Sequence, residues 1–294
     1  MLIARLIAEP STLEEALDGL IANLADTDAQ VAHAAMLDFC DDVLQIESPG
    51  DDMAGLRAAL DTHFPHSDAI LARNVISVPE VFVSDMDSTM IGQECIDELA
   101  DFAGLKDQVA GITERAMQGE LDFETALRER VGLLAGLGED AITQCLAERI
   151  RLTTGARSLV ATLKSRGCRT VLVTGGFHHF ADSVAEQLGF ERVVGNRLEV
   201  ANGKLTGGLV GTITDSSTKK AVLVEEMAAR GQNAVSMAAG DGANDIPMLE
   251  ASTYGIAYRA KPKARAAANG WVDRGDLTSL LRLLEIPEKD WRIS

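Results

Sequence analysis

Two aspartates, Asp85 and Asp87, follow the apolar run at residues 81–83. A short run of β-branched and aromatic residues predicts a buried strand, and the polar residues 84–89 predict a turn at its end. Because side chains alternate along a strand, Asp85 and Asp87 leave it on the same side. Such carboxylates repel each other unless a cation lies near them, and oxygen ligands suit Mg²⁺. The pattern predicts a magnesium site or, more simply, a strand followed by a helix with an aspartate cap.

Two later predicted strands, at residues 168–173 and 234–239, also end in groups that could bind an anion or a metal. These groups are Thr174, Gly175 and Gly176 after the first strand, and Asp241, Asn244 and Asp245 after the second. Lys219 adds a cation at the start of the helix predicted for residues 219–230. Each group alone is compatible with an ordinary turn or a surface lysine. Together they supply a nucleophile, hydroxyl and amide donors, a cation and metal ligands, which phosphoryl transfer requires.

The elements that must position these groups alternate between strands and helices, which predicts an α/β fold. With a further strand at residues 254–257, they form a parallel sheet whose carboxyl ends bind ligands. The long stretch between the first two strands shows only helical patterns, which predicts a helical cap inserted at about residues 95–153. Asn202 and Gly203 predict a hairpin turn. We therefore expect one domain at residues 79–294 with an inserted cap.

Residues 1–78 predict a separate, small α+β domain, joined to the rest by a linker around Pro79. Its strands and helices are expected at residues 2–8, 12–24, 35–46, 53–63 and 69–75. The segment resembles ligand-binding regulatory modules only weakly, and its sequence contains no phosphate loop or cluster of metal ligands. Packing or dimerisation is therefore the simpler role, with regulation as the alternative.

The acidic composition restricts the partners. The formal net charge is −18, and residues 1–80 hold 3 basic and 15 acidic residues, so the acidity lies mainly outside the predicted site. Nucleic acid and anionic membranes need a basic surface, so neither is expected, whereas a small phosphorylated substrate is compatible. No apolar run approaches the roughly 18 residues of a membrane span, and neither a signal peptide nor a disulfide or zinc pattern is recognisable. We expect a cytoplasmic protein with reduced cysteines, either a monomer or a homodimer.

The ordered set of DMDST at 85–89, TGG at 174–176, Lys219 and GDGAND at 240–245 is similar to the four motifs of haloacid-dehalogenase-type (HAD) phosphatases. The resemblance covers roughly residues 81–284, and it is strongest for the enzymes that hydrolyse O-phospho-L-serine to L-serine and phosphate. It implies a HAD-type, Rossmann-like parallel sheet with a helical cap, Mg²⁺ as cofactor, and the last step of L-serine biosynthesis as the reaction. The N-terminal domain lies outside the matching region, so its role does not follow from the resemblance.

The resemblance implies a division of roles between the two aspartates. Asp85 would attack phosphorus and form an aspartyl-phosphate, while Asp87 would protonate the leaving serine oxygen and later deprotonate water. The Asp85 carboxylate, the Asp87 backbone carbonyl and Asp241 would hold Mg²⁺. Asp245 would orient Lys219 or a metal-bound water.

Phosphate binding is assigned by the same resemblance to Thr174, the Gly175 amide and Lys219. Many relatives have serine in place of Thr174, but the hydroxyl group is retained. Lys220 is the alternative to Lys219, and the apolar residues that follow favour Lys219. Asn244 would support the loop beside the substrate.

Arg130 lies within the apolar face of its predicted helix, since Phe123, Leu127 and Leu134 share a sector of about 60° with it at 100° per residue. A charge there needs a partner, which could be an internal salt bridge or a substrate carboxylate. The resemblance implies the carboxylate. Arg128 points away from this face and is interpreted as a solvent residue.

Three further residues match substrate-binding positions of the family. Glu94 matches the residue that pairs with the substrate ammonium group, and Met117 and Phe123 match the apolar wall around the substrate. The simpler explanations are a helix-start acid for Glu94 and helix-core packing for the other two. His178 and His179 are interpreted as loop or cap-facing residues.

Two other functions remain open. The protein could act on another small phosphate, such as phosphohomoserine or phosphothreonine, or it could be a sensor whose N-terminal domain binds an amino acid. Loss of Asp85, Asp87 or Lys219 would mark a sensor without catalysis, and all three residues are present.

Overall fold

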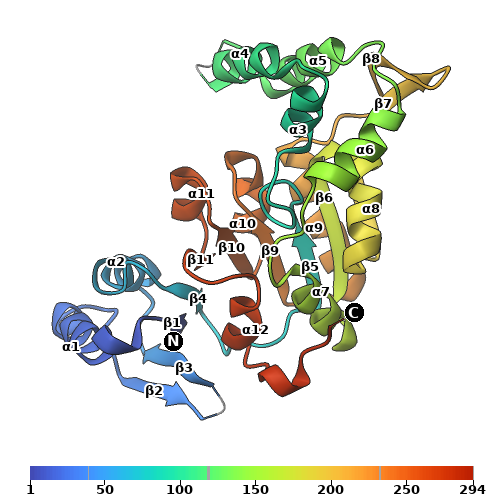
Figure 1. Cartoon of the computed structure of the whole chain (residues 1–294). Coiled ribbons are helices and arrows are strands. Elements are labelled where there is room, and N and C mark those ends of the chain that lie inside the picture. The colour runs from blue at the N-terminus through green and yellow to red at the C-terminus, as the bar shows by residue number, and fades with distance from the viewer. Residues whose placement is uncertain (39, 118–119, 232, 294) are drawn as a thin grey trace.

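The computed structural model describes residues 1–38, 40–117, 120–231 and 233–293, without the side chains of Cys40, Asp41 and Met117. Within these residues the strands form one sheet of 11 strands, in the order β2-β3-β1-β4-β11-β10-β9-β5-β6-β7-β8 (Figure 1). The strands are β1 (Leu2–Ile7), β2 (His33–Leu37), β3 (Cys40–Ser48), β4 (Asp68–Ala72), β5 (Val81–Ser84), β6 (Arg169–Phe177), β7 (Arg192–Ala201), β8 (Lys204–Val210), β9 (Ser236–Gly240), β10 (Tyr254–Tyr258) and β11 (Gly270–Val272).

The helices cover both faces of the sheet and form the cap. They are α1 (Leu13–Leu24), α2 (Met53–His63), α3 (Cys95–Phe102), α4 (Lys106–Met117), α5 (Phe123–Leu133), α6 (Asp140–Arg149), α7 (Ala156–Ser165), α8 (His178–Leu188), α9 (Ser216–Arg230), α10 (Ile246–Ala251), α11 (Pro262–Ala267) and α12 (Ser279–Leu283). Asp52, Asp122 and Asp215 begin α2, α5 and α9 by accepting a backbone N–H three residues further on. None of the helices in the described ranges combines the length and apolar character that a membrane crossing needs.

Side chains that alternate along the strands build a core on each face of the sheet. Phe82 of β5 packs into the same core as α7, α8 and α12, whereas Val81 and Val83 pack on the opposite face with α9 and α10. Full burial of such a side chain contributes about 1.5–3 kcal/mol. Burial on both faces explains why β5 is a continuous apolar run.

The predicted parallel sheet is confirmed. β11, β10, β9, β5, β6 and β7 run parallel, with β5 between β9 and β6. The expected break after residue 173 was wrong, because β6 continues to Phe177 through a bulge in its pairing with β7. An irregularity of this kind bends the strand and redirects its side chains.

The N-terminal α+β part extends the same sheet. β2, β3, β1 and β4 pair antiparallel, and β4 also pairs antiparallel with β11. A hairpin of two strands, β2 and β3, occupies the region where at least one strand was predicted. Residues 73–80 connect the two parts without a helix or strand. The division at residue 78 therefore remains a prediction about independent folding.

Asp68 of β4 ties the N-terminal part to the segment after β11. Its buried carboxylate accepts the backbone N–H groups of Asp273, Arg274 and Gly275 and the hydroxyl of Ser279. These donors offset the cost of burying a charge. The two parts of the chain thus share a buried polar contact as well as the sheet.

Helices α3 to α6 form the predicted cap over the carboxyl ends of the parallel strands (Figure 1). The β7–β8 hairpin reaches into it, because the Gly136 N–H donates to the Leu205 carbonyl at 2.8 Å and the Leu205 N–H donates to the Leu137 carbonyl at 2.9 Å. Asn202 and Gly203 have φ angles of 53° and 72°, as the predicted two-residue turn requires.

Candidate active site

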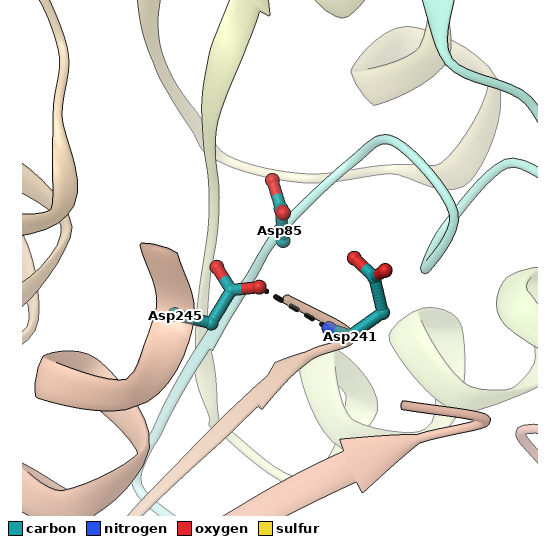
Figure 2. Close-up of side chains that lie close together, drawn as sticks. All are labelled: Asp85, Asp241 and Asp245. Atoms are coloured by element: carbon teal, nitrogen blue, oxygen red, sulfur yellow. Dashed lines mark hydrogen bonds between the residues drawn. The ribbon is translucent and has the colours of Figure 1, made fainter. Parts of the chain in front are cut away.

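Three carboxylates meet at the carboxyl ends of β5 and β9. Oxygen atoms of Asp85, Asp241 and Asp245 all lie within 4.8 Å of one another, and the side chains lie together in Figure 2. The two strands are parallel neighbours, and the Asp85 N–H donates to the carbonyl of Ala239 at 2.9 Å. This register places the loop after β9 directly beside Asp85.

Asp245 closes the loop after β9. Its Oδ2 accepts the N–H groups of Asp241 at 3.1 Å, the dashed line in Figure 2, and of Gly242 at 3.0 Å. A Cβ atom at Gly240 would lie 2.4 Å from the Asp245 carboxyl carbon, so this position requires glycine. Asp245 thus orients the backbone that carries Asp241.

Lys219 lies between Asp85 and Asp245. Its Nζ is 2.8 Å from Asp85 Oδ2 and 2.6 Å from Asp245 Oδ1, and its side chain is 1% exposed. On α9, Lys219 belongs to a buried stripe that continues with Val222, whereas Lys220 faces solvent. Lys219 rather than Lys220 therefore enters the site.

Burial and charge perturb the titration of this cluster. Burial raises the pKa of Asp85, and the carboxylate of Asp245 raises it further, against the opposing effect of Lys219. Burial would lower the pKa of Lys219, but Asp85 and Asp245 outweigh it and hold that pKa above its usual value. Three buried carboxylates with a single buried lysine leave an excess of negative charge. This all-oxygen donor set fits a hard divalent cation such as Mg²⁺.

Asp87 contacts the bulge of β6. Its Oδ1 accepts the N–H of Cys95 at 3.0 Å, and its Oδ2 accepts the hydroxyl of Thr174 at 3.4 Å. Thr174 Oγ1 in turn accepts the N–H of Gly176 at 2.8 Å. A Cβ atom at Gly176 would lie 2.7 Å from Asp87 Oδ2 and 3.1 Å from Thr174 Oγ1, so a larger residue there would displace the Asp87 carboxylate. Burial raises the pKa of Asp87, so this carboxyl group holds a proton to a higher pH than an exposed aspartate does.

Asn196 fixes the glycine loop, a role that the sequence did not reveal. Its Nδ2 donates to the Gly175 carbonyl at 2.7 Å, and its Oδ1 accepts the N–H of Thr214 at 2.8 Å. Asn196 is buried, so these bonds satisfy both ends of its amide. A polar residue within a predicted strand was the only available signal.

Asp85, Asp87, Asp241 and the segment 174–176 line one pocket of about 240 Å³ between the cap and the sheet. Its lining residues are Asp85, Asp87, Glu94, Ile96, Phe123, Leu127, Arg130, Thr174, Gly175, Gly176, Phe177, Asp241, Asn244 and Lys261. Among the predicted site residues whose side chains are described, Lys219 and Asp245 are absent from this lining; Asp245 belongs to the carboxylate cluster, and Lys219 forms ion pairs with Asp85 and Asp245. The pocket therefore brings cap residues and strand-end residues to one ligand-sized space.

Glu94 lies in the pocket as a carboxylate held by the loop that precedes it. The Ser88 hydroxyl donates to Glu94 Oε1 at 2.9 Å. Burial, followed by the negative charge of Asp87, raises the pKa of Glu94 to about 7. Glu94 is the residue before α3 and remains exposed to solvent at the pocket, where its carboxylate, when ionised, can pair with a cationic group of a ligand.

Arg130 enters the pocket from α5. Its Nε donates to the carbonyl of Ala126 at 3.3 Å, and it forms no ion pair with the carboxylates of the described residues. Burial lowers the pKa of Arg130, and the negative charges of Asp97 and Glu94 oppose that effect. The internal salt bridge that was the alternative for Arg130 is therefore not found in the described part.

Phe123 packs over the glycine loop rather than in a helix core. It is 40% exposed, and a ring carbon lies 3.4 Å from the position of a Cβ on Gly175. Ile96 and Leu127 complete the apolar lining. Met117 ends α4, but its side chain lies outside the described part of the structure.

One lysine of the pocket was not predicted, and His178 and His179, which were interpreted as loop or cap-facing residues, lie in the first turn of α8. Lys261, whose Nζ is 3.3 Å from Asp241 Oδ2, lines the pocket and was not predicted. It follows the strand predicted at residues 254–257, so the strand-end rule could have found it. His178 bonds to Asp182 at 2.8 Å, and neither His178 nor His179 is in the pocket lining.

The haloacid dehalogenase-like hydrolase family matches residues 82–250. This range contains the acidic cluster, the bulge and Lys219, and excludes the N-terminal part. The chain therefore belongs to the haloacid dehalogenase-like hydrolases.

Curated relatives narrow this class. The chain is 44% identical over 207 residues to the phosphoserine phosphatase of Albidiferax ferrireducens, covering 68% of this chain and 87% of the relative. It is also 44% identical over 211 residues to that of Archaeoglobus fulgidus, covering 70% of this chain but only 60% of the relative. The solved probable phosphoserine phosphatase of Vibrio cholerae is 31% identical with a TM-score of 0.76, over 98% of this chain and 88% of that one. Within the hydrolase family, the chain falls among the phosphoserine phosphatases.

Proposed function

We propose that the protein hydrolyses O-phospho-L-serine to L-serine and phosphate, the last step of L-serine biosynthesis. The main support is that Glu94 and Arg130, which have opposite charges, line the same pocket as Asp85. In addition, Arg130 has no ion pair among the described residues. Phosphoserine has an ammonium group, a carboxylate and a phosphate. Each would find a complementary group in this pocket, with the carboxylate bound to the guanidinium.

The first half of the proposed reaction uses both aspartates. An oxygen of Asp85 attacks phosphorus as the bond between phosphorus and the serine oxygen breaks, which leaves an aspartyl-phosphate. Asp87 gives its proton to the departing serine oxygen. Thr174, the Gly175 amide and Lys219 would bind the phosphate oxygens. This would hold phosphorus in line between the Asp85 carboxylate and the serine oxygen.

The second half regenerates the enzyme. Asp87, now ionised, takes a proton from a water molecule, and the water oxygen attacks phosphorus. The bond between Asp85 and phosphorus breaks, so phosphate leaves and both aspartates return to their starting states. The raised pKa of Asp87 favours its recovery of the proton.

We assign Mg²⁺ to the Asp85 and Asp241 carboxylates and the Asp87 carbonyl, with Asp245 in support. When bound, the ion supplies positive charge that offsets the repulsion between Asp85 and a phosphate dianion. That repulsion is about 4 kcal/mol per pair of unit charges about 4 Å apart at an effective dielectric near 20. Lys219 shares this task and orients Asp85 through their 2.8 Å contact.

Phosphate release from a panel of esters tests the proposal. We expect the highest kcat/KM for O-phospho-L-serine, above phosphothreonine, phosphohomoserine and phosphoglycolate. Turnover should stop in EDTA and return with added Mg²⁺. A higher kcat/KM for another ester would identify that compound as the substrate instead. Turnover that persists in EDTA would show that the reaction does not require a metal ion.

The pKa of Glu94 predicts a pH dependence of substrate binding. Because that pKa is raised to about 7, Glu94 is largely protonated below pH 7 and attracts an ammonium group only above it. The KM for phosphoserine should therefore fall as pH rises through about 7. Phosphoglycolate lacks the ammonium group, so its KM should lack this component. Kinetics of Glu94→Gln give the check, since a pH dependence that survives in this variant would come from another group.

We also propose that the protein is cytoplasmic. Cys95, Cys145 and Cys168 are free and buried, which agrees with the cytoplasmic location expected from the sequence. A homodimer, with the N-terminal part as its contact, stays a prediction that light scattering would address.

A further inference from the structure

Lys261 is a second lysine at the acidic cluster, and the proposed reaction gives it no role. It precedes Pro262, which begins α11. Its backbone N–H donates to the Asp241 carbonyl at 2.9 Å, and its Nζ lies 3.3 Å from Asp241 Oδ2. Lys261 therefore contacts an assigned metal ligand with both its backbone and its side chain.

The two lysines divide the carboxylates between them. Lys219 forms ion pairs with Asp85 and Asp245, while Lys261 is the ion-pair partner of Asp241 in the part of the chain that the structure describes. Their exposure differs, since the side chain of Lys219 is 1% exposed and that of Lys261 is 61% exposed. An exposed lysine in one ion pair is weakly held, whereas a buried lysine in two ion pairs is not.

We propose that Lys261 is a mobile counter-ion of the magnesium site, which neutralises Asp241 while no metal is bound and leaves it when the metal binds. The inference rests on the metal site of the proposed function and goes beyond it. The Asp241 side chain is only 10% exposed, so an unpaired anion there would be costly. Lys261 removes this cost in the metal-free protein and frees a carboxylate oxygen when it departs.

The backbone of Lys261 is fixed, so only its side chain has to move. The hydrogen bond to the Asp241 carbonyl and the ring of Pro262 restrict the main chain. The flexible four-carbon side chain stays attached beside Asp241, so a metal ion must compete with its ammonium group. Lys261 therefore weakens metal binding and stabilises the metal-free site.

Calorimetric titration of Mg²⁺ into the metal-free, full-length protein tests this role without any phosphate ester. We expect the Kd for Mg²⁺ to fall about fivefold in Lys261→Met, the size expected when one part-exposed ion pair no longer competes. Lys261→Gln, which removes the charge but keeps a polar side chain, should lower the Kd for Mg²⁺ by a similar factor. The melting temperature of both variants should be lower than that of the unsubstituted protein without metal, and the rise on adding Mg²⁺ should be larger.

Lys263→Met is the matched control, because Lys263 is an exposed lysine two residues further on, in the first turn of α11. Its Kd should equal that of the unsubstituted protein. An unchanged or higher Kd in both Lys261 variants would overturn the counter-ion role, and absence of Mg²⁺ binding in the unsubstituted protein would overturn it together with the metal site. Failure to hydrolyse phosphoserine with Mg²⁺ binding intact would overturn the substrate assignment alone.

Discussion

Replacing Asp85 by asparagine is expected to lower kcat for O-phospho-L-serine by at least about 10⁴-fold, because an amide cannot serve as the attacking nucleophile. The fold should survive, since asparagine has nearly the same volume and Lys219 keeps its 2.6 Å contact with Asp245. Phosphate release gives the activity, and thermal melting gives the state of the fold.

Asp182→Asn is the control for this substitution. Asp182 is an exposed aspartate on α8 that pairs with His178 outside the pocket. Its loss should leave kcat near that of the unsubstituted protein. Near-normal turnover in Asp85→Asn would exclude Asp85 as the nucleophile.

Replacing Arg130 by alanine should raise the KM for phosphoserine about 100-fold, the loss expected for two charge-assisted hydrogen bonds to a carboxylate. An aryl phosphate such as p-nitrophenyl phosphate has no carboxylate, so its KM should change by less than about threefold. The comparison of the two substrates separates binding of the carboxylate from a general loss of structure.

The same helix supplies the control for Arg130. Arg128 is exposed and pairs with Glu124 at 2.7 Å, so Arg128→Ala removes a guanidinium from α5 without touching the pocket. It should leave both KM values unchanged. Equal effects of Arg130→Ala on both substrates would make Arg130 a structural residue.

Residues at strand ends were the most predictable part of the site. Asp85, Thr174 and Asp241 follow buried apolar runs, and the geometry of a parallel sheet brings such positions together wherever they lie in the sequence. Arg130 could also be recognised from the sequence as a candidate site residue, because a charge within an apolar helical stripe needs a partner. Local periodicity and one general rule of sheet architecture predicted these positions, whereas the role of each residue came from the resemblance to the HAD phosphatases.

Residues that depend on tertiary contacts were less predictable. Asn196 acts through the Gly175 carbonyl, which lies in the segment where the pairing of β6 with β7 shifts register. Lys261 follows the last predicted strand, so its place at the sheet edge was predictable, but its contact with Asp241 was not. The short elements after it, α11, β11 and α12, lack the length to give a clear periodic signal. The β7–β8 hairpin was predicted from its turn residues, but the local sequence does not show that the hairpin contacts the cap.

The pairing of β4 with β11 also determines when the protein can finish folding. The Asn269 side chain donates to the Leu71 carbonyl across a separation of 198 residues. At a synthesis rate of about 5–20 residues per second, β4 emerges roughly 10–40 s before its partner strand exists. One edge of the N-terminal strands stays open during this time and can pair with other chains. The last strand of the sheet therefore sets both the end of folding and the length of exposure to misassembly.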